Sequence, residues 1–280
     1  MASFLDDVSA PKGTLRMVCA STMIVLVAIT LLPIQWICTR FGLPPRRWVP
    51  MLFHRAVARI IDLRITIEGE PSKERPILIL ANHVSWLDIT ALGTIMPLSF
   101  IAKSEIENWP VFGLLAKLQR SIFVDRNRRT RTMENSEAIA ERLEEGDPII
   151  LFAEATTSDG NRILPFRSSL VGAARAAILS DSPTTQVHIQ PVSVAYNRSD
   201  GLPTGRMGRA RIGWYGDMEI AGHILSVLRG GALDVTIRFG EVMTDDGVAN
   251  RKVLTRTAEQ TVRLMLAEGL TGRKPRAEPA

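Results

Sequence analysis

The longest apolar stretch of the chain lies near its N-terminus. Residues 17–39 (MVCASTMIVLVAITLLPIQWICT) hold 23 positions without a charged side chain. About 20 apolar residues in a helix are enough to cross the hydrocarbon core of a bilayer. The pattern predicts a transmembrane or membrane-anchoring helix at 17–39, preceded by a short tail at 1–16. A cleavable signal peptide fits less well, because the apolar run is long and no small-residue cleavage pattern follows it.

Basic residues are concentrated after this segment. The charged residues before it include both signs, whereas six arginines follow it, namely Arg40, Arg46, Arg47, Arg55, Arg59 and Arg64. Short segments rich in Lys and Arg next to a membrane helix stay on the cytoplasmic side. We therefore expect the remainder of the chain to face the cytosol. Whether the helix crosses the bilayer or lies in its interface stays open at this stage.

Beyond the apolar segment, short apolar runs alternate with helical patterns. Residues 49–63 carry apolar and basic positions at helical spacing. The runs with β-strand composition are RITIE (64–68), PILILA (76–81), SFIA (99–102), SIFVD (121–125), PIILFAE (148–154), VHIQPVSVA (187–195) and VTIRFGEVM (235–243). Further helical patterns lie near 86–96, 109–118, 130–145, 168–180 and 250–268.

Apolar strands bounded by helices indicate a sheet that is covered on its faces. The expected fold is therefore an α/β domain over 40–270, with a mixed central sheet flanked by helices and the membrane helix before it. A flexible tail is expected at 271–280, where the sequence is polar and proline-containing. The turn-rich segment 197–216 is expected to be a mobile surface element.

Composition narrows the possible partners. The chain has 280 residues, 46% hydrophobic and 22% charged, with a formal net charge of +5. This charge favours an anionic partner such as nucleic acid, a phospholipid surface or an acidic substrate. Cys19 and Cys38 both lie in the apolar segment, and in a helix they would stand nearly 30 Å apart. They therefore predict no disulfide and no metal pair.

The stretch NHVSWLD (82–88) follows the apolar run ILILA directly. In one interpretation Ser85 and Asp88 form a capping-box-like start to the next helix, and His83 is a loop residue. In the other, the strand delivers His83 to the edge of the sheet, and Asp88 accepts a hydrogen bond from one imidazole nitrogen. The second nitrogen would then be a base that can take a proton from a hydroxyl group.

Two other strand ends carry polar residues. SIFVDR (121–126) ends in Asp125 and Arg126, and PIILFAEATTSDG (148–160) ends in Glu154 and a hydroxyl-rich loop. Open α/β sheets place their binding sites at the carboxyl ends of their strands. These two strand ends therefore favour the active-site interpretation of His83.

Together these blocks resemble the glycerolipid acyltransferase family over about residues 60–195, and most closely its lyso-ornithine lipid acyltransferases. The family pattern N-H-x-x-x-x-D is matched by Asn82, His83 and Asp88. The strand ending in D-R is matched by 122–126, F-P-E-G-T by Phe152, Glu154 and Thr156, and an apolar-Pro-apolar run by Pro191 and Val192. One such block is weak evidence, but four in the family's order behind a membrane helix are specific.

The chain departs from the family pattern at four positions. Ala153 and Ala155 replace the family's Pro and Gly, and Arg120 replaces a Gly before the second block. If the loop needs a positive φ at 155, the alanine there is strained. Many lysophosphatidate acyltransferases have Arg directly after the Thr of the third block, where this chain has Thr157.

The resemblance implies a membrane-bound enzyme that moves an acyl group from an acyl thioester, on acyl carrier protein or CoA, to a lysolipid hydroxyl. His83 would be the catalytic base and Asp88 would orient it. The residues expected to bind substrate are Arg126, Glu154, Thr156, Asn82 and Lys103. The resemblance implies no metal, no cofactor and no nucleic acid, and its bacterial members suggest the inner membrane.

The acceptor is the open part of this expectation. An ornithine headgroup carries an amine and a carboxylate, whereas lysophosphatidate carries a dianionic phosphate. The lack of Arg at position 157 favours lyso-ornithine lipid, with lysophosphatidate as the alternative. A membrane-anchored module that only binds anionic lipid would explain the charge but not the His83, Asp88 and Glu154 pattern.

Overall fold

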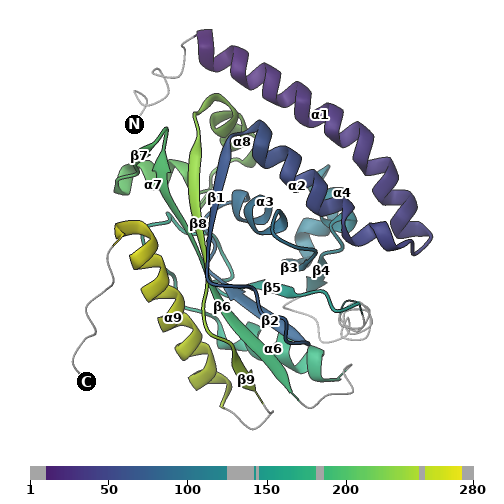
Figure 1. Cartoon of the computed structure of the whole chain (residues 1–280), viewed down its shortest axis with the longest axis vertical. Coiled ribbons are helices and arrows are strands. Elements are labelled where there is room, and N and C mark those ends of the chain that lie inside the picture. Colours follow the sequence, from purple (N-terminus) through teal and green to yellow (C-terminus); the bar gives the residue numbers. More distant parts are fainter. Residues whose placement is uncertain (1–10, 125–141, 143–144, 181–185, 246–249, 273–280) are drawn as a thin grey trace.

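The computed structural model describes residues 11–124, 142, 145–180, 186–245 and 250–272. It contains a nine-stranded mixed sheet in the order β1-β8-β6-β2-β5-β3-β4, with β7 and β9 also paired to β6 (Figure 1). The strands are β1 (Leu63–Glu68), β2 (Ile77–Ala81), β3 (Ser99–Lys103), β4 (Ile122–Val124), β5 (Ile149–Phe152), β6 (Val187–Ser199), β7 (Leu202–Pro203), β8 (Leu233–Phe239) and β9 (Met243–Asp245). The predicted mixed α/β sheet is confirmed.

Parallel strands form the part of the sheet that carries the four sequence blocks. β2 lies between β5 and β6 and is parallel to both, with Ala81 opposite Phe152 and Val192. β3 continues the parallel arrangement with β5 and β4. β8 is parallel to β1 and antiparallel to β6. The carboxyl ends of β2, β5, β3 and β4 therefore meet at one edge of the sheet.

Helices cover both faces of the sheet. The first face is covered by α2 (Val49–Ile60), α3 (Leu87–Gly93) and α8 (Ile220–Arg229), and the second by α6 (Ser168–Ser180) and α9 (Arg251–Thr271). Alternate residues of β2 divide between the faces, because Ile77 and Ile79 join the first core and Leu78 and Leu80 the second. This two-sided burial explains the uninterrupted apolar run ILILA.

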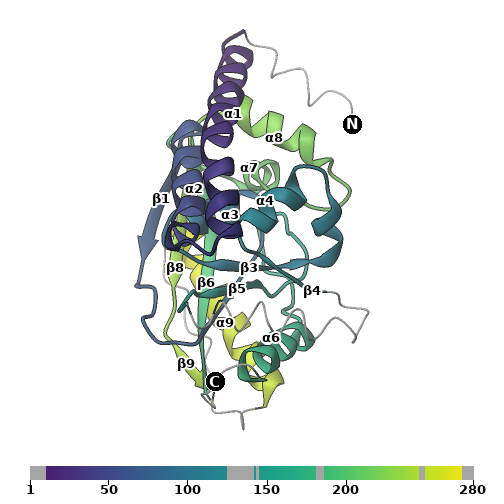
Figure 2. The ribbon, with the colours of Figure 1, turned by 90° about the vertical axis from the view of Figure 1, so that its right-hand side faces the viewer.

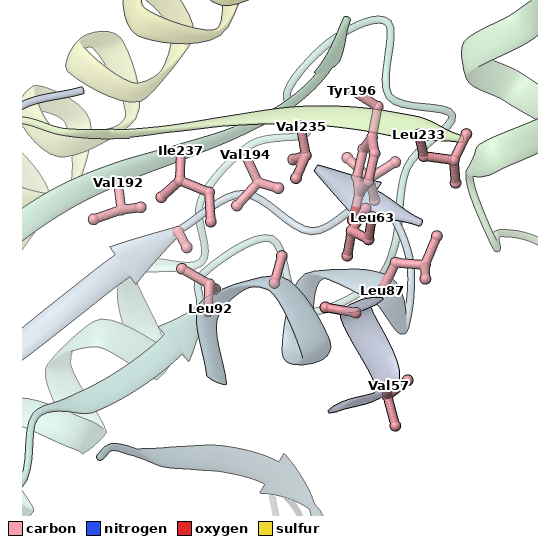
Figure 3. Close-up of a cluster of buried hydrophobic side chains, with 14 of the residues drawn as sticks. Val57, Leu63, Leu87, Leu92, Val192, Val194, Tyr196, Leu233, Val235 and Ile237 are labelled. Carbon is pink, nitrogen blue, oxygen red and sulfur yellow. The ribbon is translucent and has the colours of Figure 1, made fainter. Parts of the chain in front are cut away.

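The first core fixes α3 directly against the sheet. Val192, Val194, Val235 and Ile237 point from β6 and β8 toward Leu87 and Leu92 of α3 (Figure 3). Leu87 and Leu92 are almost fully buried. Helix α3, which begins within NHVSWLD, is therefore packed directly against the sheet.

The predicted membrane helix corresponds to α1 (Pro11–Arg40), which begins six residues earlier than the apolar segment. It packs on α2, α8 and the short 3₁₀ helix η2 (Pro44–Arg47), and Figures 1 and 2 show it running lengthwise over the domain. The Gln35 amide is 2% exposed and donates to the carbonyls of Arg46 and Leu118. Most of the apolar side chains of α1 remain exposed, among them Leu15, Val18, Leu26, Ile29 and Trp36.

Several elements differ from the sequence prediction. The run 235–243 is divided between two strands, β8 and β9, which both pair antiparallel with the long strand β6. The pairing stops after Phe239, opposite Val192, and resumes at Met243, opposite Ile189. The segment 197–216, expected to be a mobile surface element, contains β7 and α7 (Arg206–Ile212) and buries Ile212. Helix α8 was not predicted, and the helix expected at 130–145 lies almost wholly outside the described residues.

The other predicted helices are present with shifted ends. α3 is shorter than 86–96, and α4 (Phe112–Leu118) begins three residues later than expected, after the 3₁₀ helix η3 (Ser104–Asn108). α6 matches 168–180, and α9 continues to Thr271. The assigned limits of the acyltransferase domain and of the two tails remain predictions.

Candidate active site

Asn82 continues strand β2 through its side chain. Its amide nitrogen donates to the carbonyl of Val194 at 3.0 Å, and its amide oxygen accepts from the N–H of Val194 at 2.8 Å. The side chain thereby imitates one more pair of sheet hydrogen bonds. The residue is 1% exposed and both of its polar atoms are bound to β6, so its expected contact with substrate stays a prediction.

His83 and Asp88 form the hydrogen-bonded pair that the second interpretation of NHVSWLD predicts. Nδ1 of His83 lies 2.7 Å from Oδ2 of Asp88. The same oxygen accepts hydrogen bonds from the N–H groups of Val84 at 2.6 Å and Ser85 at 3.0 Å. Asp88 therefore organises both the histidine and the turn that leads into α3.

The capping interpretation is correct only in part. Asp88 reaches back to the N–H of Ser85, as the acidic residue of a capping box does. The hydroxyl of Ser85, however, is buried and has no hydrogen-bond partner within the described part of the chain, and α3 begins at Leu87. The two interpretations therefore hold together, with Asp88 as their common element.

Tyr196 binds the other oxygen of Asp88. Its hydroxyl donates to Oδ1 at 2.8 Å, and Asp88 is fully buried. Burial and the neighbouring Asp88 carboxylate raise the pKa of Tyr196 well above its usual value, so the hydroxyl keeps its proton. The role of Tyr196 was not predicted from the sequence. The only local signal is a single tyrosine in an apolar strand, and its partner Asp88 is 108 residues away.

The imidazole of His83 rests on an aromatic stack. Its ring is 3.8 Å from that of Phe152 at an angle of 10°, and Phe152 stacks on Phe100 at 5.9 Å. The His83 side chain is 17% exposed. With the Nδ1 proton directed at Asp88, the lone pair lies on Nε2, and that nitrogen is able to accept a proton from a substrate.

Backbone contacts hold the His83 loop from two further segments. The carbonyl of His83 accepts from the N–H and the hydroxyl of Ser158 at 2.8 and 3.2 Å. The carbonyl of Val84 accepts from the N–H of Trp214 at 2.9 Å. Trp214 lies in the segment expected to be a mobile surface element, so this segment is instead part of the support of the site.

Glu154 also supports the loop. Its Oε1 accepts from the N–H of His83 at 2.7 Å, and its Oε2 accepts from the N–H of Leu164 at 2.8 Å. Burial raises the pKa of Glu154 from 4.5 to about 8, and the two backbone hydrogen bonds only partly oppose this shift. Its hydrogen-bond partners among the described residues are both backbone N–H groups.

Two of the family departures lie at unusual backbone angles. Ala155 has φ 66° and Arg120 has φ 63°, in the left-handed region that favours glycine. The expected strain at Ala155 is therefore present. Arg120 is 4% exposed and its guanidinium binds the carboxylates of Glu145 and Asp147, the latter at 3.1 Å.

An open cavity of about 470 Å³ lies beside the His83 loop. Its lining includes Val124, Glu154, Thr156, Arg167 and Ser169. Lys103 is exposed at the end of β3, in register with Val124. Arg126 lies outside the described residues, so the structure says nothing of its predicted role. No group of three or more His, Cys, Asp or Glu able to hold a metal ion occurs among the residues that were placed.

Comparison with known proteins gives one consistent family. The family model described as Acyltransferase matches residues 64–195. The lyso-ornithine lipid O-acyltransferase of Rhizobium meliloti (strain 1021) is 43% identical over 268 residues, which cover 95% of this chain and 91% of that protein. The protein of the same name from Brucella abortus (strain 2308) is 44% identical over 262 residues, which cover 94% and 98%.

The fold has a counterpart among solved structures. The crystal structure of the 1-acyl-sn-glycerophosphate acyltransferase PlsC from Thermotoga maritima superimposes with a TM-score of 0.62, and the match covers 94% of this chain and 100% of that one. The two sequences are 17% identical. This likeness shows a shared fold across almost the whole chain.

Proposed function

The chain belongs to the acyltransferase family, and from this premise we propose that it transfers a fatty acyl group from an acyl thioester to the hydroxyl of lyso-ornithine lipid. The product would be ornithine lipid. The two relatives from Rhizobium meliloti and Brucella abortus carry this activity in their names, and their similarity extends over almost the whole chain. The donor in this proposal is acyl carrier protein or acyl-CoA.

One observation carries the chemistry: Asp88 holds Nδ1 of His83 at 2.7 Å. Nε2 then removes the proton from the lysolipid hydroxyl while the oxygen attacks the thioester carbonyl carbon. The tetrahedral oxyanion collapses, the C–S bond breaks, and the thiolate takes the proton from the His83 imidazolium. Asp88 stabilises that imidazolium, and its own position is fixed by Tyr196.

The remaining predicted residues divide into two groups. Asn82 and Glu154 have their polar atoms bound to backbone groups, so we assign them to the positioning of His83. Thr156 lines the open cavity, and Lys103 at the end of β3 is in register with Val124, another lining residue. In our proposal these two, together with Arg126, contact the headgroup of the acceptor or the acidic carrier protein.

We also propose that α1 anchors the enzyme on the cytoplasmic membrane of a bacterium, with the catalytic domain in the cytosol. Residues 13–40 form a helix long and apolar enough to cross a bilayer. The exposed apolar side chains continue beyond it through Phe41, Leu43 and Trp48. Because α1 also packs along α2 and α8, an orientation in the membrane interface fits these contacts better than a helix that leaves the domain.

Lysophosphatidate is the second candidate acceptor. The solved structure with the same fold is named for that class of substrate, and an exposed Arg167 in the cavity could bind a phosphate. Thr157, however, supplies a hydroxyl and not a cation to the loop after Glu154. A zwitterionic headgroup is therefore favoured.

The test is an acyl-transfer assay on membranes that contain the protein, with labelled acyl carrier protein as donor. Lyso-ornithine lipid and lysophosphatidate are supplied as separate acceptors, and membranes with a His83→Ala variant are the control. We expect labelled ornithine lipid from the wild type only. Product from lysophosphatidate alone would establish the second candidate, and product from the His83→Ala variant would remove His83 from the mechanism.

A further inference from the structure

Arg167 occupies a fixed position at the start of α6. Its N–H donates to the carbonyl of Ala153 at 2.8 Å, and its carbonyl accepts from the N–H groups of Leu170 at 2.9 Å and Val171 at 3.2 Å. Ala153 directly precedes Glu154 and is fully buried. The backbone of Arg167 is therefore tied to the strand end that supports His83.

The guanidinium of Arg167 has no hydrogen bond and no ion pair with any residue that the structure describes. Other arginines of the domain are engaged: Arg120 binds Glu145 and Asp147, and Arg175 binds Asp245. The Arg167 side chain is exposed and lines the cavity of about 470 Å³. An unpaired guanidinium offers a planar set of N–H donors that matches a carboxylate or phosphate.

The cavity adjoins the catalytic pair through Glu154. Glu154 is a lining residue of the cavity, and its Oε1 binds the N–H of His83 at 2.7 Å. The hydroxyls of Thr156 and Ser169 also line the cavity. A headgroup in this cavity would therefore meet a cation and two hydroxyl groups next to Glu154, the residue that the cavity shares with the support of the His83 loop.

We propose that Arg167 binds the anionic group of the acceptor headgroup in this cavity. Under the proposed function, on which this inference rests, that group is the carboxylate of ornithine; for lysophosphatidate it would be the phosphate. Arg167 would form two parallel N–H···O hydrogen bonds to this group. The residue then determines affinity for the acceptor and leaves the chemistry at His83 unchanged.

The test combines an Arg167→Gln variant with a modified acceptor, lyso-ornithine lipid whose carboxylate is a methyl ester. We expect the substitution to raise KM for the free-acid acceptor by at least about tenfold, with little change in kcat or in KM for the donor. The ester should raise KM of the wild type by a similar factor. The variant should not distinguish ester from free acid, because the interaction is already absent.

Two further variants control for charge and folding. Arg167→Lys keeps the charge but loses the planar fork, so KM should lie between the wild-type and Arg167→Gln values. Arg162→Gln removes an exposed arginine five residues earlier that is not among the cavity's lining residues, and it should leave KM unchanged. The proposal would be overturned if Arg167→Gln raised KM equally for the free-acid and the methyl-ester acceptor, or changed KM for neither.

Failure of the proposed function is recognised separately. If the wild type acylates lysophosphatidate and not lyso-ornithine lipid, the comparison is repeated with lysophosphatidate. A tenfold or greater rise in its KM in the Arg167→Gln variant would then support anion binding by Arg167 although the acceptor was misassigned. An unchanged KM for lysophosphatidate would refute the role of Arg167 as well.

Discussion

At the residue scale, Asp88 has the most demanding environment in the site. Its two carboxylate oxygens accept hydrogen bonds from His83, Val84, Ser85 and Tyr196, and the residue is fully buried. An ionised carboxylate can accept all of these hydrogen bonds, because it carries no O–H donor of its own. Asp88 therefore orients the imidazole of His83 and also holds the turn at Val84 and Ser85. A change in this turn is expected to move the catalytic base.

Tyr196→Phe removes one donor from Asp88 and changes little else. A buried carboxylate oxygen without its partner costs about 1–3 kcal/mol of folding stability. We expect kcat to fall by roughly tenfold, the factor that about 1.4 kcal/mol of lost stabilisation produces, with KM for the acceptor unchanged. Steady-state kinetics and denaturant unfolding measure both effects.

The matched control is Tyr215→Phe, since the chain has two tyrosines. It should retain wild-type kcat. If Tyr196→Phe also keeps full kcat, the hydroxyl of Tyr196 does not position Asp88 in the working enzyme.

Glu154 predicts a pH dependence of folding stability. Its pKa is about 8 in the folded protein against 4.5 ordinarily, so the folded state binds this proton more tightly than the unfolded state does. Its contribution to stability is therefore largest below pH 4.5 and is lost as pH rises through about 8. Glu154→Gln lacks this titration.

The measurement is the free energy of unfolding of both proteins across this pH interval. The wild type should lose more stability than Glu154→Gln as pH rises. A constant difference between the two would show that the pKa of Glu154 is near its ordinary value.

The sequence predicted the His83–Asp88 pair because both members lie within one local motif. It did not predict the roles of Tyr196 or Arg167, because their contacts depend on how β6 and α6 meet the end of β5. It did not predict that the side chains of Asn82 and Glu154 bind backbone groups, since a polar residue after a buried strand gives no sign of whether its partner is a ligand or a backbone group. Arg126 stays a prediction.

At the element scale, the contact between α2 and α3 depends on Gly93. A Cβ atom at this position would lie 2.4 Å from Cδ2 of His54. His54 cannot move freely, because its Nε2 is 2.7 Å from Oε1 of Gln119. The absence of a side chain at Gly93 is thus what allows α3 to pack closely on α2.

Gly93→Ala therefore tests which of two opposing effects is larger. Helix propensity favours alanine over glycine by about 1 kcal/mol, whereas forcing extra volume into a packed contact costs about 1–3 kcal/mol. We expect net destabilisation, measured as the free energy of unfolding. Gly222→Ala in α8, where a Cβ meets nothing within 4 Å, should be neutral or stabilising, and stabilisation by both substitutions would contradict the packing argument.

The strands were predicted better than the helices. Uninterrupted apolar runs such as ILILA (77–81) identify strands covered on both faces. Helix α8 was missed because its ten residues are short and follow a turn-rich segment. The division of 235–243 was missed because pairing of β8 and β9 to the same strand is a tertiary property.

At the scale of the whole molecule, α1 joins the membrane and the catalytic domain. One side of it packs against the domain through Ala20 and Met17, and the other exposes apolar residues such as Leu26 and Ile29. An exposed apolar surface of this extent is typical of a membrane contact. The acceptor and product are lipids, so this arrangement keeps the site close to them.

Replacing Leu26 and Ile29 together with Asp should release the protein from membranes. Binding of an interfacial helix weakens as its buried apolar area falls, and the domain core is untouched because both side chains are exposed. Vesicle sedimentation measures the bound fraction. Leu202→Asp, at an exposed residue of β7, should stay bound, and full retention of the α1 variant would contradict the anchor.

The central claim is that the enzyme acylates lyso-ornithine lipid with His83 as the general base. The most direct measurement is mass spectrometry of lipids from cells that accumulate lyso-ornithine lipid, make no ornithine lipid, and express either the wild type or a His83→Gln variant. We predict ornithine lipid with the wild type and unchanged lyso-ornithine lipid with the variant. Unconverted lyso-ornithine lipid in cells with the wild type, or equal conversion by His83→Gln, would contradict the account.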